Sequence, residues 1–288
     1  MQGLLLWAYS HLSLLYIDGT MMSMNTVVVV SIIFALTVVM IMSGRGGGNF
    51  YVAALVLAGV AIHTASTTSQ FILLVSSLVG AFVYGKAKTM SWPLVFFFGG
   101  LNASMAFVGG FEAHAFGGKT LEFVLAALLL VAGIAMLFPE RQAHKEPKYQ
   151  FGYWNIHEGE NTYVINLWIA VPLTMATGFF AGMVGISGGS FLVPLMVVAC
   201  GVPMRIAVGT ATAMLAATAL TGFTGNALHG GFDAALAIPS GAVAIVGGWI
   251  GGKIALKTKP KSLKTISGLL TIVAAAIMAY NALARGGR

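Results

Sequence analysis

Residues 21–52 read MMSMNTVVVVSIIFALTVVMIMSGRGGGNFYV. The stretch from 21 to 42 is predominantly apolar, and a helix needs roughly 20 such residues to cross the hydrocarbon core of a bilayer. A cluster of glycines follows at once, and a second apolar segment begins at residue 49. Because clustered glycines interrupt a helix, this stretch predicts a membrane helix that breaks and then resumes.

The composition of the whole chain points to the same class of protein. Of the 288 residues, 58% are hydrophobic and 8% are charged, whereas a soluble domain is about 25% charged. The net charge of +7 is better explained by basic loops on the inner side of a membrane than by nucleic acid, so no nucleic-acid partner is expected. We therefore expect an all-α integral membrane protein surrounded by lipid.

Ten apolar segments form two groups of five, each in the order long, short, long, long, long. The expected segments are 21–42, 49–62, 65–85, 92–111 and 120–138, then 163–183, 190–200, 206–228, 235–252 and 263–282. The predicted organisation is an N-terminal apolar segment (1–20), membrane repeat 1 (21–138), a solvated cytoplasmic linker (139–161) and membrane repeat 2 (162–288). Whether residues 4–17 span the membrane, and whether the short segments cross or re-enter, is left open.

The two groups repeat each other in sequence. Residues 59–138 superimpose without a gap on 201–280, an offset of 142, and this register matches several glycines and threonines. The matched pairs include Gly59 with Gly201, Thr68 with Thr210, Gly80 with Gly222, and Gly109-Gly110 with Gly251-Gly252. A duplicated helical bundle with glycine-broken short helices is therefore predicted.

Basic residues indicate that the repeats are inverted. In an inverted arrangement 12 of the 15 Lys and Arg residues fall on the inner side and three on the outer side. The inner set is Arg45, Lys86, Lys88, Arg141, Lys145, Lys148, Arg205, Lys253, Lys257, Lys259, Lys261 and Lys264. This bias obeys the positive-inside rule and places residues 139–161 in the cytoplasm.

The glycine clusters are the first candidate site. Each lies between a long and a short segment, where a new helix would point its backbone N–H groups at a ligand, as anion sites require. The candidates are Gly46, Gly47, Gly48 and Asn49, with Ser187, Gly188, Gly189 and Ser190 in the other half. The alternative is close helix packing without a ligand.

The second candidate group opens the long helix after each short one. It consists of Thr67 and Thr68 in the first half and Gly209 and Thr210 in the second. These residues either cap the helix or form a second ring of donors that faces the glycine break.

Ionisable residues are scarce in the predicted spans, and this argues against a cation site. Arg45 and Arg205 are interpreted as inner-loop anchors, with attraction of an anion as the second reading for Arg45. His229 could carry a proton in coupled transport, the alternative being a capped or interfacial histidine. No HExxH, CxxC or phosphate-binding loop ending in GKS or GKT is present. We expect no enzyme activity, no metal and no cofactor.

The second half, over about residues 170–280, resembles the sulfite exporter TauE/SafE family of membrane permeases. The resemblance lies in an ordered set of motifs: GISGGSFLVPL (185–195), GVP (201–203), AVGT (207–210), NALH (226–229) and GGWIGG (247–252). The first half departs from the pattern at Ala53, Ala61 and Thr67. The resemblance implies export or uptake of small sulfur-containing anions, coupled to ions, in the inner membrane of a prokaryote.

We interpret the chain as a secondary transporter for sulfite, thiosulfate, sulfonates or related inorganic or organosulfur anions, working by alternating access. An anion channel and a non-transporting membrane assembly subunit are the alternatives. Association with further copies of the chain is left open.

Overall fold

The computed structural model describes residues 24–111, eight positions between 126 and 137, and residues 150–158, 161–184, 189–228 and 232–284. The first half contains α2 (Met24–Ser43), α3 (Gly48–Leu57), α4 (Ile62–Lys86) and α5 (Trp92–Phe111). The second half contains α7 (Leu167–Val184), α8 (Gly189–Pro194), the π-helical turn η2 (Leu195–Ala199), α9 (Met204–Leu228), α10 (Ala234–Lys257) and α11 (Pro260–Ala284). The described chain is mostly helical, as the sequence predicts.

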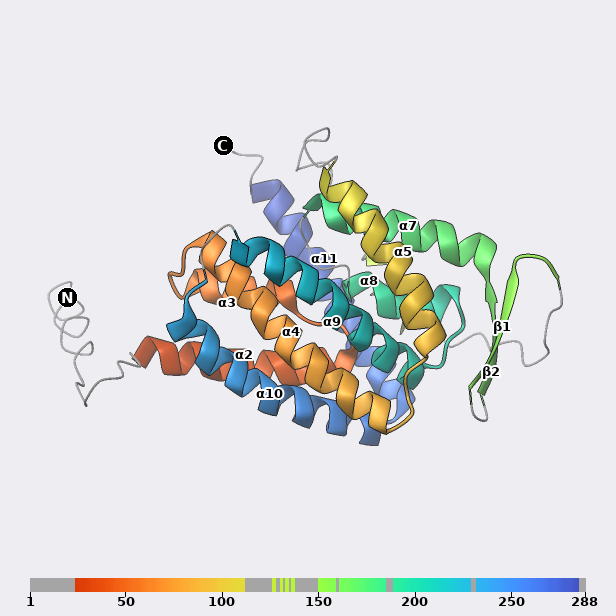
Figure 1. The fold of residues 1–288 in the computed structure, drawn as a ribbon, viewed down its shortest axis with the longest axis horizontal. Coiled ribbons are helices and arrows are strands. Elements are labelled where there is room, and N and C mark those ends of the chain that lie inside the picture. Colours follow the sequence, from red (N-terminus) through yellow and green to blue (C-terminus); the bar gives the residue numbers. More distant parts are fainter. Residues whose placement is uncertain are drawn as a thin grey trace, which may run out of the picture.

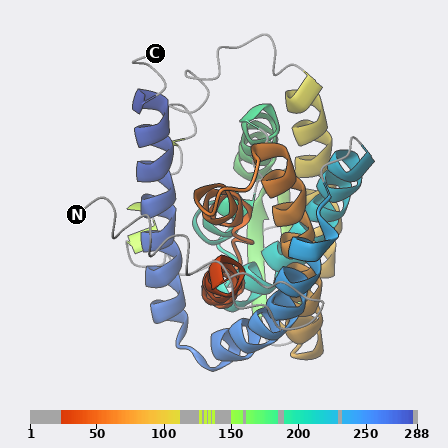
Figure 2. The same ribbon diagram turned by 90° about the vertical axis from the view of Figure 1, so that its left-hand side faces the viewer.

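Two long helices of equal length lie at the centre of the bundle. α4 packs against α9 in antiparallel orientation, since Gly80 of α4 faces Thr212 of α9 and Tyr84 faces Gly209 (Figure 1). On either side, α5 packs against α7 and α10 packs against α2. α11 stands at the edge of the bundle (Figure 2), where it contacts α2, α8 and α9.

Glycines let the outer helix pairs approach closely. A Cβ on Gly251 of α10 would lie 2.5 Å from the carbonyl oxygen of Val38 in α2. A Cβ on Gly178 of α7 would lie 2.7 Å from the carbonyl oxygen of Asn102 in α5. Such backbone-to-backbone contact is the usual way in which membrane helices associate, because lipid supplies no hydrophobic force between them.

Apolar side chains cover the outside of the bundle, and hydroxyl groups lie within it. Phe82, Phe96 and Phe107 are all more than two-thirds exposed, whereas Thr37 and Thr174 are fully buried and donate to carbonyls of their own helices. This distribution suits a protein dissolved in lipid. By length and composition, α10 and the Thr64–Lys86 part of α4 can cross a membrane.

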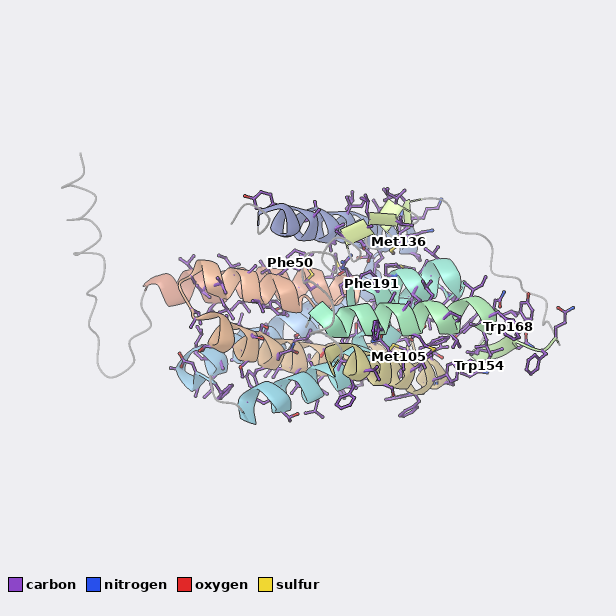
Figure 3. The ribbon with its side chains drawn as sticks, turned by 90° about the horizontal axis from the view of Figure 1, so that it is seen from above. Phe50, Met105, Met136, Trp154, Trp168 and Phe191 are labelled. Carbon is purple, nitrogen blue, oxygen red and sulfur yellow. The ribbon has the colours of Figure 1, made fainter. Side chains whose placement is uncertain are left out.

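A β-hairpin covers the end of the predicted linker and the start of the predicted span 163–183, which corrects the all-α prediction. β1 (Tyr153–Glu158) pairs antiparallel with β2 (Asn161–Asn166), and α7 starts only at Leu167. Ile156, Tyr163 and Ile165 are buried, and the Trp154 ring lies 5.2 Å from that of Phe97 at the end of the bundle (Figure 3). The sequence prediction missed this hairpin because it weighed the polar content of the segment and overlooked the period-two alternation of a strand.

Candidate functional site

The segment between α2 and α3 has a backbone that only glycine adopts readily. α2 ends at Ser43, α3 begins at Gly48, and Gly44, Gly46 and Gly47 have φ values of 71°, 73° and 69°. These values lie in the left-handed region. The predicted residues Gly46, Gly47 and Gly48 therefore form the entry to α3, together with Asn49, whose side chain lies outside the described part.

This segment lies in the middle of the bundle. A Cβ on Gly46 would lie 2.6 Å from Leu73 in α4 and 2.8 Å from Leu215 in α9. Leu73 and Leu215 are each one residue from the midpoint of a 25-residue helix. Gly44 faces the backbone of Val208 and the side chain of Val193. Elements of both halves thus enclose the segment, about halfway along α4 and α9.

The first turn of α3 carries backbone donors that have no acceptor within the helix. The N–H groups of Gly44, Arg45 and Gly47 bond to Ile41, Met40 and Arg45 carbonyls at 3.1, 3.1 and 2.9 Å. The N–H groups of Gly48 and Asn49 belong to the first turn of α3, where helix geometry offers them no acceptor within the helix. They give this end of α3 a partial positive charge.

Arg45 lies inside the protein, so the interpretation of this residue as a loop anchor was wrong. Its side chain is 2% exposed. Nη1 donates to the Ser267 carbonyl at 3.1 Å and to the Thr271 hydroxyl, both on α11. The left-handed glycines on either side let the chain turn inward at this position, which charge counting alone does not reveal. Arg205, in contrast, is exposed and donates to the Thr258 carbonyl at 3.2 Å.

The other donors of Arg45 have no partner within the described part of the chain. Nε and Nη2 are both shielded from solvent and form no hydrogen bond there. The sequence holds no acidic residue between Asp18 and Glu112 or between Glu160 and Asp233, and none after Asp233. Asp233 itself caps α10 by accepting from the N–H groups of Ala235 and Leu236. A buried cation with no carboxylate beside it is costly, and such a group favours an anion.

The predicted threonines do not form a single ring. Thr210 accepts a hydrogen bond of 3.0 Å from the Ser91 N–H, and Gly209 packs on the Thr89 carbonyl. Both residues therefore contact the turn between α4 and α5. Thr68 is fully buried, and its hydroxyl has no partner in the described region. Counted along the antiparallel helices from the Gly80–Thr212 contact, Thr68 and Thr210 lie about 20 Å apart. Thr67 is buried next to Thr68.

Several predicted site residues fall where the structure gives no side-chain description. Ser187 and Gly188 lie between α7 and α8, outside the described residues, as does His229 after α9. Gly189 and Ser190 open α8, but their side chains are likewise outside the description. Their roles as ligands, and the proton role of His229, stay predictions.

Two residues that touch Arg45 were missed at the level of sequence. Ser267 and Thr271 lie four residues apart on α11, and both are buried. The Ser267 hydroxyl donates to the Ser43 carbonyl at 3.2 Å, and the Thr271 hydroxyl donates to the Ser267 carbonyl at 2.7 Å. Two hydroxyls at this spacing share one helix face, which in an apolar helix is a signal that could have drawn attention to them.

Residues 185–189, GISGG, also fit the G-x-S-x-G spacing of serine hydrolases. In those enzymes the serine lies on a sharp turn between a strand and a helix. Here the preceding element is the apolar helix α7 and not a strand, so the structural context of that motif is missing.

A family comparison agrees with this architecture. The model of the sulfite exporter TauE/SafE family matches residues 29–278. This chain belongs to the sulfite exporter TauE/SafE family. It is therefore an integral membrane protein, and the family is one of membrane transporters.

Curated relatives carry names of the same kind. Two proteins of Bacillus subtilis (strain 168) are each 25% identical to the chain. "Probable membrane transporter protein YunE" aligns over 247 residues, 80% of this chain and 87% of its own length. "Probable membrane transporter protein YdhB" aligns over 252 residues, 85% of this chain and 99% of its own length. No solved structure matches the transporter.

Proposed function

We propose that this transporter carries small sulfur-containing anions, such as sulfite, thiosulfate or sulfonates, across the inner membrane of a prokaryote. The observation that supports this most strongly is Arg45, a buried guanidinium with two nitrogens that lack a partner and no carboxylate beside it in the described helices. An anion would neutralise this charge and accept hydrogen bonds from the N–H groups in the first turn of α3.

The second glycine cluster completes the proposed site. The sequence repeat places Ser187, Gly188, Gly189 and Ser190 in the role that residues 46–49 hold in the first half. Gly44 already faces Val193 of α8 and Val208 of α9, so elements next to the second cluster border the first. The proposed binding site therefore lies between the two glycine breaks, with ligands from both repeats.

We further propose transport by alternating access between two inverted repeats. In the sequence register α2 corresponds to α7 and α5 to α10. A two-fold axis between the halves would convert the contact of α5 with α7 into a contact of α10 with α2. Both contacts are present. Because Nε and Nη2 of Arg45 are sealed from solvent, an anion reaches them only when the surrounding helices move apart.

Flux measurements in proteoliposomes test this proposal. We expect Arg45→Ala to lower the initial rate of radiolabelled sulfite uptake by at least about tenfold, because the charge-assisted bonds to the anion are lost. The matched control is Arg205→Ala, which removes an exposed arginine and should transport at the wild-type rate. Wild-type uptake by Arg45→Ala would contradict the proposed site.

The same preparation separates the rival functions. Counterflow, in which unlabelled sulfite inside the vesicles accelerates entry of labelled sulfite, is expected of an alternating-access transporter and excludes a channel. A purified chain that shows no flux by itself and copurifies with a second membrane protein would favour an assembly subunit.

A further inference from the structure

We propose that Arg45 binds two oxygens of one anionic group through the edge formed by its Nε–H and Nη2–H, and that Thr271 positions this edge. The inference rests on the proposed anion site at Arg45. It adds which atoms of the guanidinium face the ligand, which residue orients them and which anions this geometry selects.

Nε and Nη2 of Arg45 form the edge of the guanidinium that can recognise a pair of oxygen atoms. In a planar guanidinium the Nε–H bond and one Nη2–H bond point in the same direction, so the two form a fork. Both atoms of this fork lack a partner in the described chain, while Nη1 is occupied. The edge suited to paired oxygens is thus the one without a partner among the described residues.

α11 fixes the opposite side of the group. Nη1 donates to the Ser267 carbonyl and to the Thr271 hydroxyl, and that hydroxyl in turn donates to the Ser267 carbonyl at 2.7 Å. The Ser267 hydroxyl donates to the carbonyl of Ser43, the last residue of α2. α11 therefore holds both the end of α2 and the Arg45 head group. A guanidinium held at Nη1 has less freedom to rotate, which pre-organises its fork.

A selectivity follows from this arrangement. An anion with two oxygens on one atom, such as a sulfite or a sulfonate, accepts two parallel hydrogen bonds from the fork. Chloride is a single spherical acceptor and gains no such paired geometry. A lysine at the same position would keep the charge but lose the fork. The fork therefore selects oxyanions over halides, whereas the charge alone attracts both.

Binding measurements on the purified full-length protein in lipid nanodiscs test this. The probes are sulfite, methanesulfonate and chloride, and the readout is the ratio of the chloride Kd to each oxyanion Kd. We expect Arg45→Lys to bind anions but to lower this ratio by about tenfold or more, the loss of one charge-assisted bond.

Thr271 gives the second arm of the experiment. Thr271→Val removes the hydroxyl that accepts from Nη1 and should lower the same ratio, while Thr271→Ser keeps the hydroxyl and should restore it. The control is Thr265→Val on the same helix, since the exposed Thr265 hydroxyl donates to the Lys261 carbonyl and its loss should leave the ratio unchanged. If Thr271→Val is not monodisperse, Arg45→Lys alone decides.

The outcomes distinguish this inference from the function on which it rests. A wild-type ratio in Arg45→Lys, or no oxyanion preference in the wild type, overturns the fork even if Arg45→Ala has lost sulfite uptake. Sulfite uptake at the wild-type rate by Arg45→Ala overturns the proposed site itself.

Discussion

At the scale of single residues, the sequence identified the glycine segment but misjudged Arg45. Glycines in a row next to an apolar span predict an interrupted helix on general grounds, and Gly46 and Gly47 do have left-handed backbones. The location of the Arg45 side chain depends on that local turn and on Ser267 and Thr271, more than 220 residues away in sequence. A contact of this range has no local sequence pattern, so it needed the fold.

Gly46 should be sensitive to substitution because of its neighbours as well as its backbone. Gly46→Ala adds a left-handed strain of about 1–2 kcal/mol and places a Cβ 2.6 Å from Leu73. The control is Gly59→Ala, where φ is also positive but nothing lies within 4 Å. Thermal unfolding should show a larger loss for Gly46→Ala. Equal losses of stability in the two variants would show that the packing around Gly46 does not contribute to the stability of the protein.

Removing the Arg45 charge should not weaken the ligand-free fold. Arg45→Met replaces a buried guanidinium with an apolar chain of similar length. This removes the cost of a buried charge that has no carboxylate partner in the described chain, which offsets the loss of the two Nη1 hydrogen bonds to α11. We expect the Tm of the ligand-free variant to equal or exceed that of the wild type in differential scanning fluorimetry. A marked fall in Tm would instead assign Arg45 a structural role.

At the scale of elements, the bounds of several described helices were well predicted and the β-hairpin was not. The expected span 92–111 has the same bounds as α5, and 206–228 differs from α9 by two residues at its start. Apolar length suffices for such spans because a bilayer forces their backbone to bond internally. The β-hairpin at 153–166 lies outside that constraint, and its burial depends on the Phe97 region that it covers.

The glycine contact between α2 and α10 gives a prediction for helix packing. Gly251→Ala places a Cβ 2.5 Å from the Val38 carbonyl oxygen, so the helices must separate, at a cost of about 1–3 kcal/mol. The control Gly100→Ala lies on α5 with nothing within 4 Å and should gain up to about 1 kcal/mol of helix propensity. Chemical unfolding in detergent compares the two, and an unchanged Gly251→Ala would refute the close packing.

At the scale of the whole molecule, the structure brings basic helix ends together. α4 and α10 run in the same direction, since Phe71, Ser76 and Val83 face Gly241, Gly248 and Gly252 in turn. Lys86 and Lys257 therefore lie at the same end of the bundle. Because α9 is antiparallel to α4, Arg205 near the start of α9 lies at this end too. Arg45 was counted among the 12 basic residues of the inner side. The excess of basic residues on that side remains without it.

Side-specific labelling checks this orientation. In a Cys200→Ala background, Lys86→Cys and Lys257→Cys should both react with a membrane-impermeant maleimide only from the cytoplasmic side. Labelling of the two positions from opposite sides would refute the shared end, and labelling of both from outside would invert the topology.

We propose above all that Arg45 holds the transported anion. Equilibrium binding of radiolabelled sulfite to the purified transporter tests it most directly, with Arg45→Met compared against the wild type. We predict saturable binding by the wild type and none by Arg45→Met, while both proteins remain monodisperse with comparable Tm. Saturable sulfite binding of wild-type affinity in Arg45→Met would show that Arg45 does not hold the anion.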